Sequence, residues 1–135
     1  MAGVVPNEGE AVIADMVFKR VLTDRDAVLQ LGLFTNQTPT ETTALTAITE
    51  PTGTGYARKN LTDASWTGTA DTRAFAKQTF TGGAGGWAGS VYGYFIATKA
   101  AGGTPRLLCY ELDASGPYTI NENDTYDVTP NITVA

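Results

Sequence analysis

Hydrophobic residues follow a two-residue period, or form short apolar runs, along most of the chain after residue 27. The densest run covers residues 87–98 and carries apolar side chains on both alternating faces. In a regular strand, one face would hold Val91, Phe95 and Ala97, and the other would hold Tyr92, Tyr94 and Ile96. A strand that is apolar on both faces either lies inside a sandwich or faces a partner.

The same period predicts several further strands, separated by turns rich in glycine, proline, asparagine and aspartate. The predicted strands cover residues 27–34, 55–61, 72–80, 106–112, 118–120 and 126–134, with a shorter one at 44–49. Turns are expected at 82–86, 100–105, 113–117 and 121–124, and the one at 100–105 makes a hairpin of 87–98 with 106–112. Pro130 interrupts the last strand, which indicates an edge position or a bulge. The pattern predicts an all-β fold, an antiparallel β-sandwich or jelly-roll-like barrel of about seven or eight short strands.

Residues 7–22 have helical periodicity instead. Asn7 is expected to cap this helix, with Glu10 three residues further on. An apolar stripe follows at three- and four-residue steps, made of Val12, Ile13, Met16, Val17 and Val21. The helix could pack on the domain's own sheet or lie against a neighbouring subunit. We therefore divide the chain into an N-terminal arm and helix, residues 1–24, and a β-sandwich domain, residues 25–135.

Composition supports the strand-rich prediction and excludes several functions. Fifteen glycines and six prolines fit a fold with many turns. The net charge of −5 argues against nucleic-acid binding, which needs a basic surface. We find neither a secretory signal near the N-terminus nor an apolar run long enough to cross a membrane. We expect a protein made in a cytoplasm that binds no nucleic acid and no membrane.

The chain offers little catalytic chemistry. Histidine is absent, which removes Ser-His-Asp and Cys-His catalysis and the usual zinc sites. The single cysteine, Cys109, lies in an apolar run and is predicted to be buried and structural. The glycine-rich segment 82–86 lacks the Lys-Ser/Thr of a phosphate-binding loop. We expect no catalytic residue, no cofactor and no metal, and hence no enzyme.

Two polar groupings and one aromatic set remain to be interpreted. Glu111 and Asp113 flank Leu112. A glycosidase needs two acids that face each other across a cleft, and one outward pair at the end of a strand does not supply that geometry. We therefore predict that these two residues are a solvated pair. Residues 121–127 alternate oxygen-bearing side chains that favour a hairpin turn and leave weak calcium binding open. The aromatic side chains could stack on sugars, fill the core or form a protein interface.

Several motifs give the chain a family resemblance. In order, these are Leu33-Phe34-Thr35-Asn36, Thr49-Glu50-Pro51 with Gly55-Tyr56, Leu61-Thr62 with Trp66, Gln78-Thr79-Phe80-Thr81, Val91-Tyr92-Gly93-Tyr94-Phe95, Tyr110-Glu111, Gly116-Pro117-Tyr118 and Asp127-Val128-Thr129-Pro130. Over residues 27–135 the sequence resembles small virion proteins of tailed bacteriophages, in particular the capsid decoration or cement proteins of cyanophages.

The resemblance implies a mechanical function. Proteins of this kind bind the outside of the mature phage head, bridge neighbouring capsomers and stabilise the shell. It implies the major capsid protein and further copies of the chain, as a dimer or trimer, as partners, and the capsid surface of the virion as the location. We predict interfaces at Val12, Met16, Val17, Tyr92 and Tyr94. The alternatives are a tail or fibre-associated protein that binds a host glycan through Trp66, Trp87 or Tyr56, and a neck or tail-completion protein.

Overall fold

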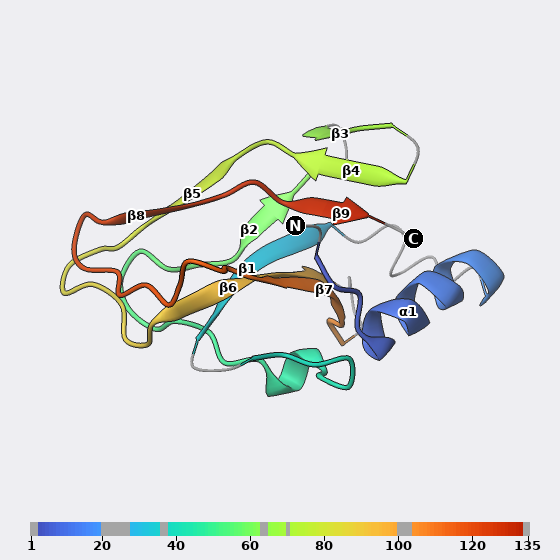
Figure 1. The fold of residues 1–135 in the computed structure, drawn as a ribbon, viewed down its shortest axis with the longest axis horizontal. Helices are drawn as coiled ribbons and strands as arrows, with labels where there is room; N and C mark the ends of the chain where they lie inside the picture. Colours follow the sequence, from blue (N-terminus) through green and yellow to red (C-terminus); the bar gives the residue numbers. More distant parts are fainter. Residues whose placement is uncertain are drawn as a thin grey trace.

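The computed structural model describes residues 3–19, 28–35, 38–62, 65–69, 71–99 and 104–133. These residues form an all-β, sandwich-like fold of nine short strands in antiparallel sheets, with one helix near the N-terminus (Figure 1). The predicted fold class is confirmed. The end of the predicted helix, residues 20–22 with Val21, and Val134 of the last predicted strand lie outside the described residues.

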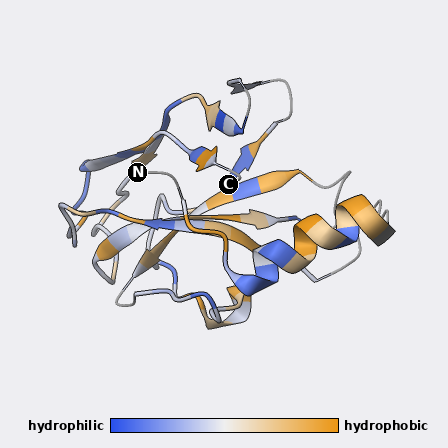
Figure 2. Ribbon diagram, turned by 45° about the vertical axis from the view of Figure 1, so that its right-hand side comes forward, coloured by the Kyte–Doolittle hydropathy of each residue, from blue (hydrophilic) through white to orange (hydrophobic). Residues whose placement is uncertain are grey.

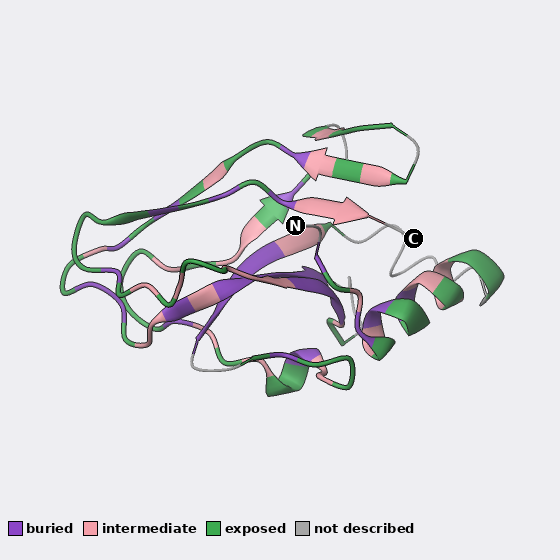
Figure 3. Ribbon diagram, viewed as in Figure 1, coloured by how far each residue is buried: buried purple, intermediate pink, exposed green. Residues whose placement is uncertain are grey.

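A four-stranded sheet forms the centre of the molecule, in the order β2-β1-β6-β7. Its strands are β1 (Leu29–Thr35), β2 (Lys59–Leu61), β6 (Val91–Thr98) and β7 (Leu107–Leu112). Most residues of β1, β6 and β7 are buried (Figure 3). The sheet is buried because other segments cover both of its faces. The predicted hairpin of 87–98 with 106–112 is confirmed, although its first strand begins at Val91.

The remaining strands form a layer over one face of the central sheet. One group has the order β3-β4-β9, with β3 (Trp66–Thr67), β4 (Thr72–Phe75) and β9 (Asn131–Thr133). The other pairs β5 (Gln78–Thr81) with β8 (Thr125–Val128). The prediction of one strand each at 72–80 and 126–134 was wrong, because each run splits into two strands. Pro130 lies at the split, where it has no N–H to donate, and its carbonyl accepts the N–H of Phe75.

Two hydrophobic clusters lie on opposite faces of the central sheet. The larger one lies under the covering strands and includes Leu31, Leu33 and Phe80. The smaller one includes Phe34, Phe95 and Leu45. Leu45 belongs to η2 (Leu45–Ala47), a single 3₁₀ turn, so the strand predicted at 44–49 was wrong. This segment covers the sheet with one buried leucine and does not extend its ladder.

A β-bulge changes the two faces of β6. Phe34 pairs with Gly93 and Thr35 pairs with Val91, so Tyr92 has no partner in the register. Because a bulge adds one residue to one strand, the alternation of side chains shifts at that point. Tyr94 therefore joins the larger cluster and Tyr92 packs on the smaller one. The prediction that Tyr92 and Tyr94 share a face was wrong.

The N-terminal helix is α1 (Asn7–Ala14), and it continues as the π-helical segment η1 (Asp15–Lys19). Pro6, and not Asn7, occupies the N-cap position, and no side chain caps the helix. The predicted cap at Asn7 was therefore wrong. The N–H of Asn7 donates to the carbonyl of Glu41, which provides the missing acceptor. Glu8 and Glu10 place negative charge in the first turn, where the helix dipole favours it.

Cys109 lies on β7 and is completely buried in the larger cluster. Burial raises the pKa of its thiol to about 12, since a thiolate would lose its solvation there. The prediction of a buried, structural cysteine is confirmed. A thiol with this pKa is poorly nucleophilic at neutral pH.

Candidate functional site

An apolar groove lies between α1 and the covering strands, with a volume of about 420 Å³. We call it the α1 groove. Its lining comprises Val5, Ile13, Met16, Leu29, Trp66, Asp71, Arg73, Leu108 and Ile132. Only Asp71 and Arg73 carry charge, and they come from the start of β4 and the residue before it. A groove with this lining is suited to apolar side chains of a protein partner.

The wall made by α1 is held against β7 by close packing. Gly9 is buried at the helix–strand contact, and a Cβ atom at this position would overlap the backbone carbonyl of Leu108. One turn further on, Val12 is fully buried in the larger cluster. Gly9 lets the helix approach the strand and Val12 anchors it there. The face of α1 that carries Ile13 and Met16 is thereby fixed beside the groove.

A carboxylate secures the first turn of the same helix. Oε2 of Glu8 accepts the backbone N–H of Leu45 at 2.8 Å and that of Leu107 at 2.6 Å. Leu107 adjoins the register shift in the β6–β7 ladder, where its N–H needs an acceptor from outside the sheet. Glu8 thus joins α1, η2 and β7 through charge-assisted hydrogen bonds.

The opposite wall of the groove depends on an aromatic pair. Trp66 on β3 packs edge-to-face on Phe75 of β4, with 5.2 Å between ring centroids. Phe75 is buried, whereas Trp66 is only half-buried and lines the groove. The pair therefore gives the groove a rigid aromatic surface.

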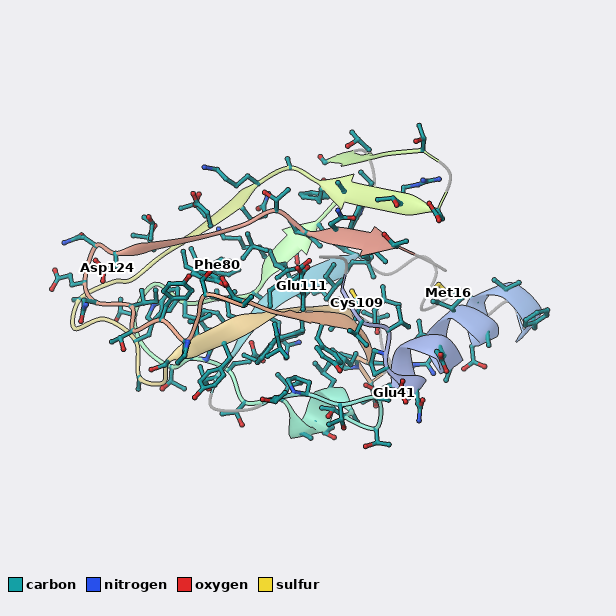
Figure 4. All side chains as sticks on the ribbon, viewed as in Figure 1. Met16, Glu41, Phe80, Cys109, Glu111 and Asp124 are labelled. Carbon is teal, nitrogen blue, oxygen red and sulfur yellow. The ribbon has the colours of Figure 1, made fainter. Side chains whose placement is uncertain are left out.

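The structure separates the five predicted interface residues. Val12 and Tyr94 lie in the core, with 0% and 7% of their surface exposed. Met16 lines the α1 groove and is labelled in Figure 4 between the helix and the strands. Val17 is 61% exposed. Tyr92 is half-buried against the smaller cluster, on the far side of the sheet from Tyr94.

Sequence reasoning missed Phe18, which is 84% exposed at the end of the helical segment. It lies outside the stripe used to orient the helix, so the stripe gave no reason to select it. Figure 2 shows the end of this helix as strongly hydrophobic. The sequence nevertheless contained a signal for an exposed apolar residue, because Met16, Val17 and Phe18 form an apolar run too wide for one buried helix face.

A second, polar cleft of about 460 Å³ contains two tyrosine–carboxylate pairs. Tyr94 donates its hydroxyl hydrogen to Glu111 at 2.6 Å, and Tyr126 donates to Asp113 at 2.8 Å. Tyr94 Oη also accepts the N–H of Asn131 at 3.3 Å. These bonds join β6, β7 and the C-terminal strands. Glu111 and Asp113 therefore serve the fold and are not the simple solvated pair that the sequence indicated.

Burial raises the pKa of Tyr94 and Tyr126 above the ordinary value, and the hydrogen bonds to carboxylates raise both further. Tyr56 behaves in the same way beside Glu50. Unfolded tyrosines ionise near pH 10, about 10 being their reference pKa. Because the folded pKa is the higher one, this stabilisation is fully present below pH ~10 and is lost as the pH rises above it.

We therefore expect the chain to unfold in alkali as these three tyrosines ionise. Tyrosinate absorbance and circular dichroism should be followed together from pH ~9 upward. The part of the absorbance that comes from these three tyrosines should rise in the same cooperative transition in which the circular dichroism is lost. In the Tyr94→Phe variant the absorbance amplitude of that transition should fall. Ionisation of all the tyrosines near pH ~10 with intact circular dichroism would contradict the assigned hydrogen bonds.

The aromatic residues proposed for sugar stacking are mostly in the core. Trp87 is 6% exposed, and its indole N–H donates to the carbonyl of Thr54 at 3.2 Å. Tyr56 packs on both Phe80 and Trp87 and donates its hydroxyl hydrogen to Glu50 at 2.6 Å. Trp66 alone of the three candidates lines an open groove. The structure thus provides no shared stacking surface for a glycan at these residues.

The turn at 121–124 is closed by one of its own side chains, that of Asp124. Oδ2 of Asp124 accepts the N–H of Asn121 at 2.9 Å and its side-chain amide at 3.0 Å. Asn123 has a φ of 67°, as is common for asparagine in tight turns. Among the described residues no three acidic or sulfur ligands lie together in a way that would hold a metal ion. The turn predicted at 121–124 is confirmed, but it does not form a hairpin, because β8 begins at Thr125 and pairs with β5. Asp124 lies at the end of the molecule opposite Met16 (Figure 4).

Comparisons of the chain with family models, curated proteins and solved structures gave no match. Within the described part of the chain, no helix has the length and apolar character of a membrane span. The fold and the groove together define this chain as a β-sandwich-like domain with an apolar groove beside its helix.

Proposed function

We propose that this chain is a structural virion protein of the capsid decoration or cement type. In this role it binds the outer surface of a phage head, where it bridges capsomers of the major capsid protein and has no enzymatic activity. The proposal starts from the sequence resemblance over residues 27–135. The apolar α1 groove supports it, because a protein that acts by assembly needs such a surface.

The distribution of polar and apolar groups is the observation that carries this proposal. The tyrosines and carboxylates described above are engaged in hydrogen bonds that hold the fold together. An apolar groove instead lies open beside α1, and four large apolar side chains of the described residues are exposed. Large exposed apolar patches on a folded domain usually mark protein contacts. The arrangement favours association over chemistry.

Cementing a shell follows from two thermodynamic effects. A protein that binds only the mature lattice stabilises that lattice by mass action. Many copies bound to one shell, each touching more than one capsomer, gain further affinity through multivalency. A modest affinity at each contact is then sufficient. An assembly surface on each copy, such as the α1 groove, would add contacts between neighbouring copies.

Counting copies in purified particles tests this proposal. A decoration protein should be present in a simple ratio to the major shell subunit, whereas a neck or tail-completion protein should be present in few copies. Absence from the particle would refute the structural role. A glycan-binding role makes a different prediction, namely that sugars change the fluorescence of Trp66.

A further inference from the structure

Strand β8 has one edge that is open to further pairing. Among the described strands, β8 pairs with β5 alone. Because the carbonyl of Asp124 accepts the N–H of Gly82, the alternation of the ladder directs the backbone groups of every second residue of β8 away from β5. These outward residues are Thr125 and Asp127. An edge with unpaired N–H and C=O groups can accept another strand.

Two hollows run beside this strand. One is the polar cleft of about 460 Å³ described above, and the other has a volume of about 670 Å³. They share Asp113, Tyr126 and Asp127, and between them they are lined by every residue from 125 to 129. Among the described residues that line them, none belongs to β5. The hollows therefore provide open space on the side of β8 that faces away from β5.

The charge of both hollows has one sign. The acidic residues in the two linings are Glu111, Asp113, Asp124 and Asp127, and no lysine or arginine occurs among the described lining residues. Tyr126 and Asn121 donate hydrogen bonds to Asp113 and Asp124, but these donors are neutral and leave the negative charge uncompensated. A basic segment would supply the opposite charge, whereas an acidic one would be repelled.

Lys77 is the one basic side chain with an ion pair to these acids among the described contacts. Its Nζ lies 2.9 Å from Oδ2 of Asp127, and the two side chains are 62% and 45% exposed. Water and salt screen an ion pair with this exposure, so it offsets little of the local charge. The edge of β8 consequently lies in an acidic environment.

We propose that the open edge of β8 binds an extended segment of a partner protein that carries lysine or arginine side chains. The segment pairs with the backbone of Thr125 and Asp127 by strand addition, and its basic side chains lie among the carboxylates of the two hollows. Figure 1 shows β8 at the end of the molecule opposite α1, so this contact is separate from the α1 groove. It goes beyond the decoration role and does not depend on it.

Amide hydrogen exchange of the full-length chain, followed by NMR, tests the pairing without any substitution. The probe is the peptide acetyl-Lys-Val-Lys-Thr-Lys-Val-Lys-amide. With free peptide at about ten times its Kd, exchange of the Thr125 and Asp127 amides should slow about tenfold, because bound amides do not exchange. The amides of Tyr126 and Val128 already pair with β5 and should change less.

Two modified peptides separate strand addition from attraction between charges. Methyl groups on the odd or on the even backbone nitrogens block opposite edges of the same peptide and keep its charge. Since only one edge can pair with β8, the affinities of the two should differ at least about tenfold. Equal affinities would show that charge alone drives binding and would overturn the proposed strand addition.

A matched pair of variants tests the charge. Asp127→Asn removes a carboxylate from both linings and should weaken binding of the lysine peptide about threefold. Glu122→Gln makes the same change in net charge at an exposed residue that lies in neither lining, and should leave the affinity unchanged. Circular dichroism checks that both variants fold. Equal losses in the two variants would refute the role of the hollows.

Absence of binding at about 1 mM lysine peptide would overturn the inference, as would equal binding of a peptide with glutamate in place of lysine. These outcomes are separable from the proposed function. A chain that ignores the peptide yet is present in many copies per particle would refute the strand addition and leave the decoration role intact. A chain that binds the peptide but is absent from particles would do the reverse.

Discussion

Replacing Gly9 with alanine should destabilise the protein by about 2–3 kcal/mol, the cost of forcing extra volume into a packed contact. At a solvent-facing helix position the same change would stabilise by up to about 1 kcal/mol, because alanine is the better helix former. The sign reverses here because a Cβ atom at Gly9 would overlap the carbonyl of Leu108. Since β7 is fixed in the central sheet, α1 must move away.

Urea unfolding of Gly9→Ala beside Ala11→Gly measures this effect. Ala11 lies on the exposed side of the same helix, and its loss should cost about 1 kcal/mol of helix propensity. Because α1 forms one wall of the groove, Gly9→Ala should also weaken any association that depends on the groove. A Gly9→Ala variant more stable than wild type would show that the helix does not pack on β7 as described.

Removing the carboxylate of Glu8 is expected to have an effect of similar or greater size. Glu8→Ala leaves the N–H groups of Leu45 and Leu107 without their acceptor. Each charge-assisted bond is worth about 1.5–3 kcal/mol, so the free energy of unfolding should fall by about 3–5 kcal/mol. Glu8→Gln keeps an oxygen acceptor but loses the charge, and should cost about half as much.

Thermal and urea unfolding of the two Glu8 variants should be compared with Glu10→Ala. Glu10 lies in the same first turn and is exposed, so it controls for the charge near the helix N-terminus. Its replacement should cost no more than about 1 kcal/mol. Equal effects of Glu8→Ala and Glu10→Ala would mean that the bonds to Leu45 and Leu107 do not stabilise the fold.

The sequence pattern predicts the centre of this fold well, for a physical reason. Strands buried on both faces are nearly continuous apolar runs, and residues 91–98 and 107–112 have that character. The sequence between them contains glycine and proline, which predicts a hairpin. Cys109 was recognised as a core residue in the same way. Local periodicity suffices where a strand's surroundings are uniformly apolar.

Periodicity fails where a residue's role depends on a distant segment. The bulge at Tyr92 arises from pairing with β1, so the order of residues in β6 alone cannot show it. Glu8 resembled an ordinary first-turn acid, yet its bonds reach residues 37 and 99 positions away. Leu45 resembled a strand residue because one buried leucine does not define a period. Each of these features exists only after the chain has folded.

The candidate site was anticipated in part. The helical stripe included Met16, which lines the groove, and Val17, which is exposed. The stripe also included Val12, which the structure places in the core, and it omitted Phe18. Trp66, Leu108 and Ile132 come from three separate strands. Only the tertiary fold brings them to the helix, so the groove could not be derived from local patterns.

Absolute quantification of this chain in purified phage particles tests the central proposal most directly. The tryptic peptide of residues 60–73 contains neither methionine nor cysteine and can be synthesised with heavy isotopes as an internal standard. A peptide of the major shell subunit, measured in the same digest, gives the ratio. We predict a simple stoichiometric ratio to that subunit. A handful of copies per particle, or none, would contradict a role in decorating the capsid.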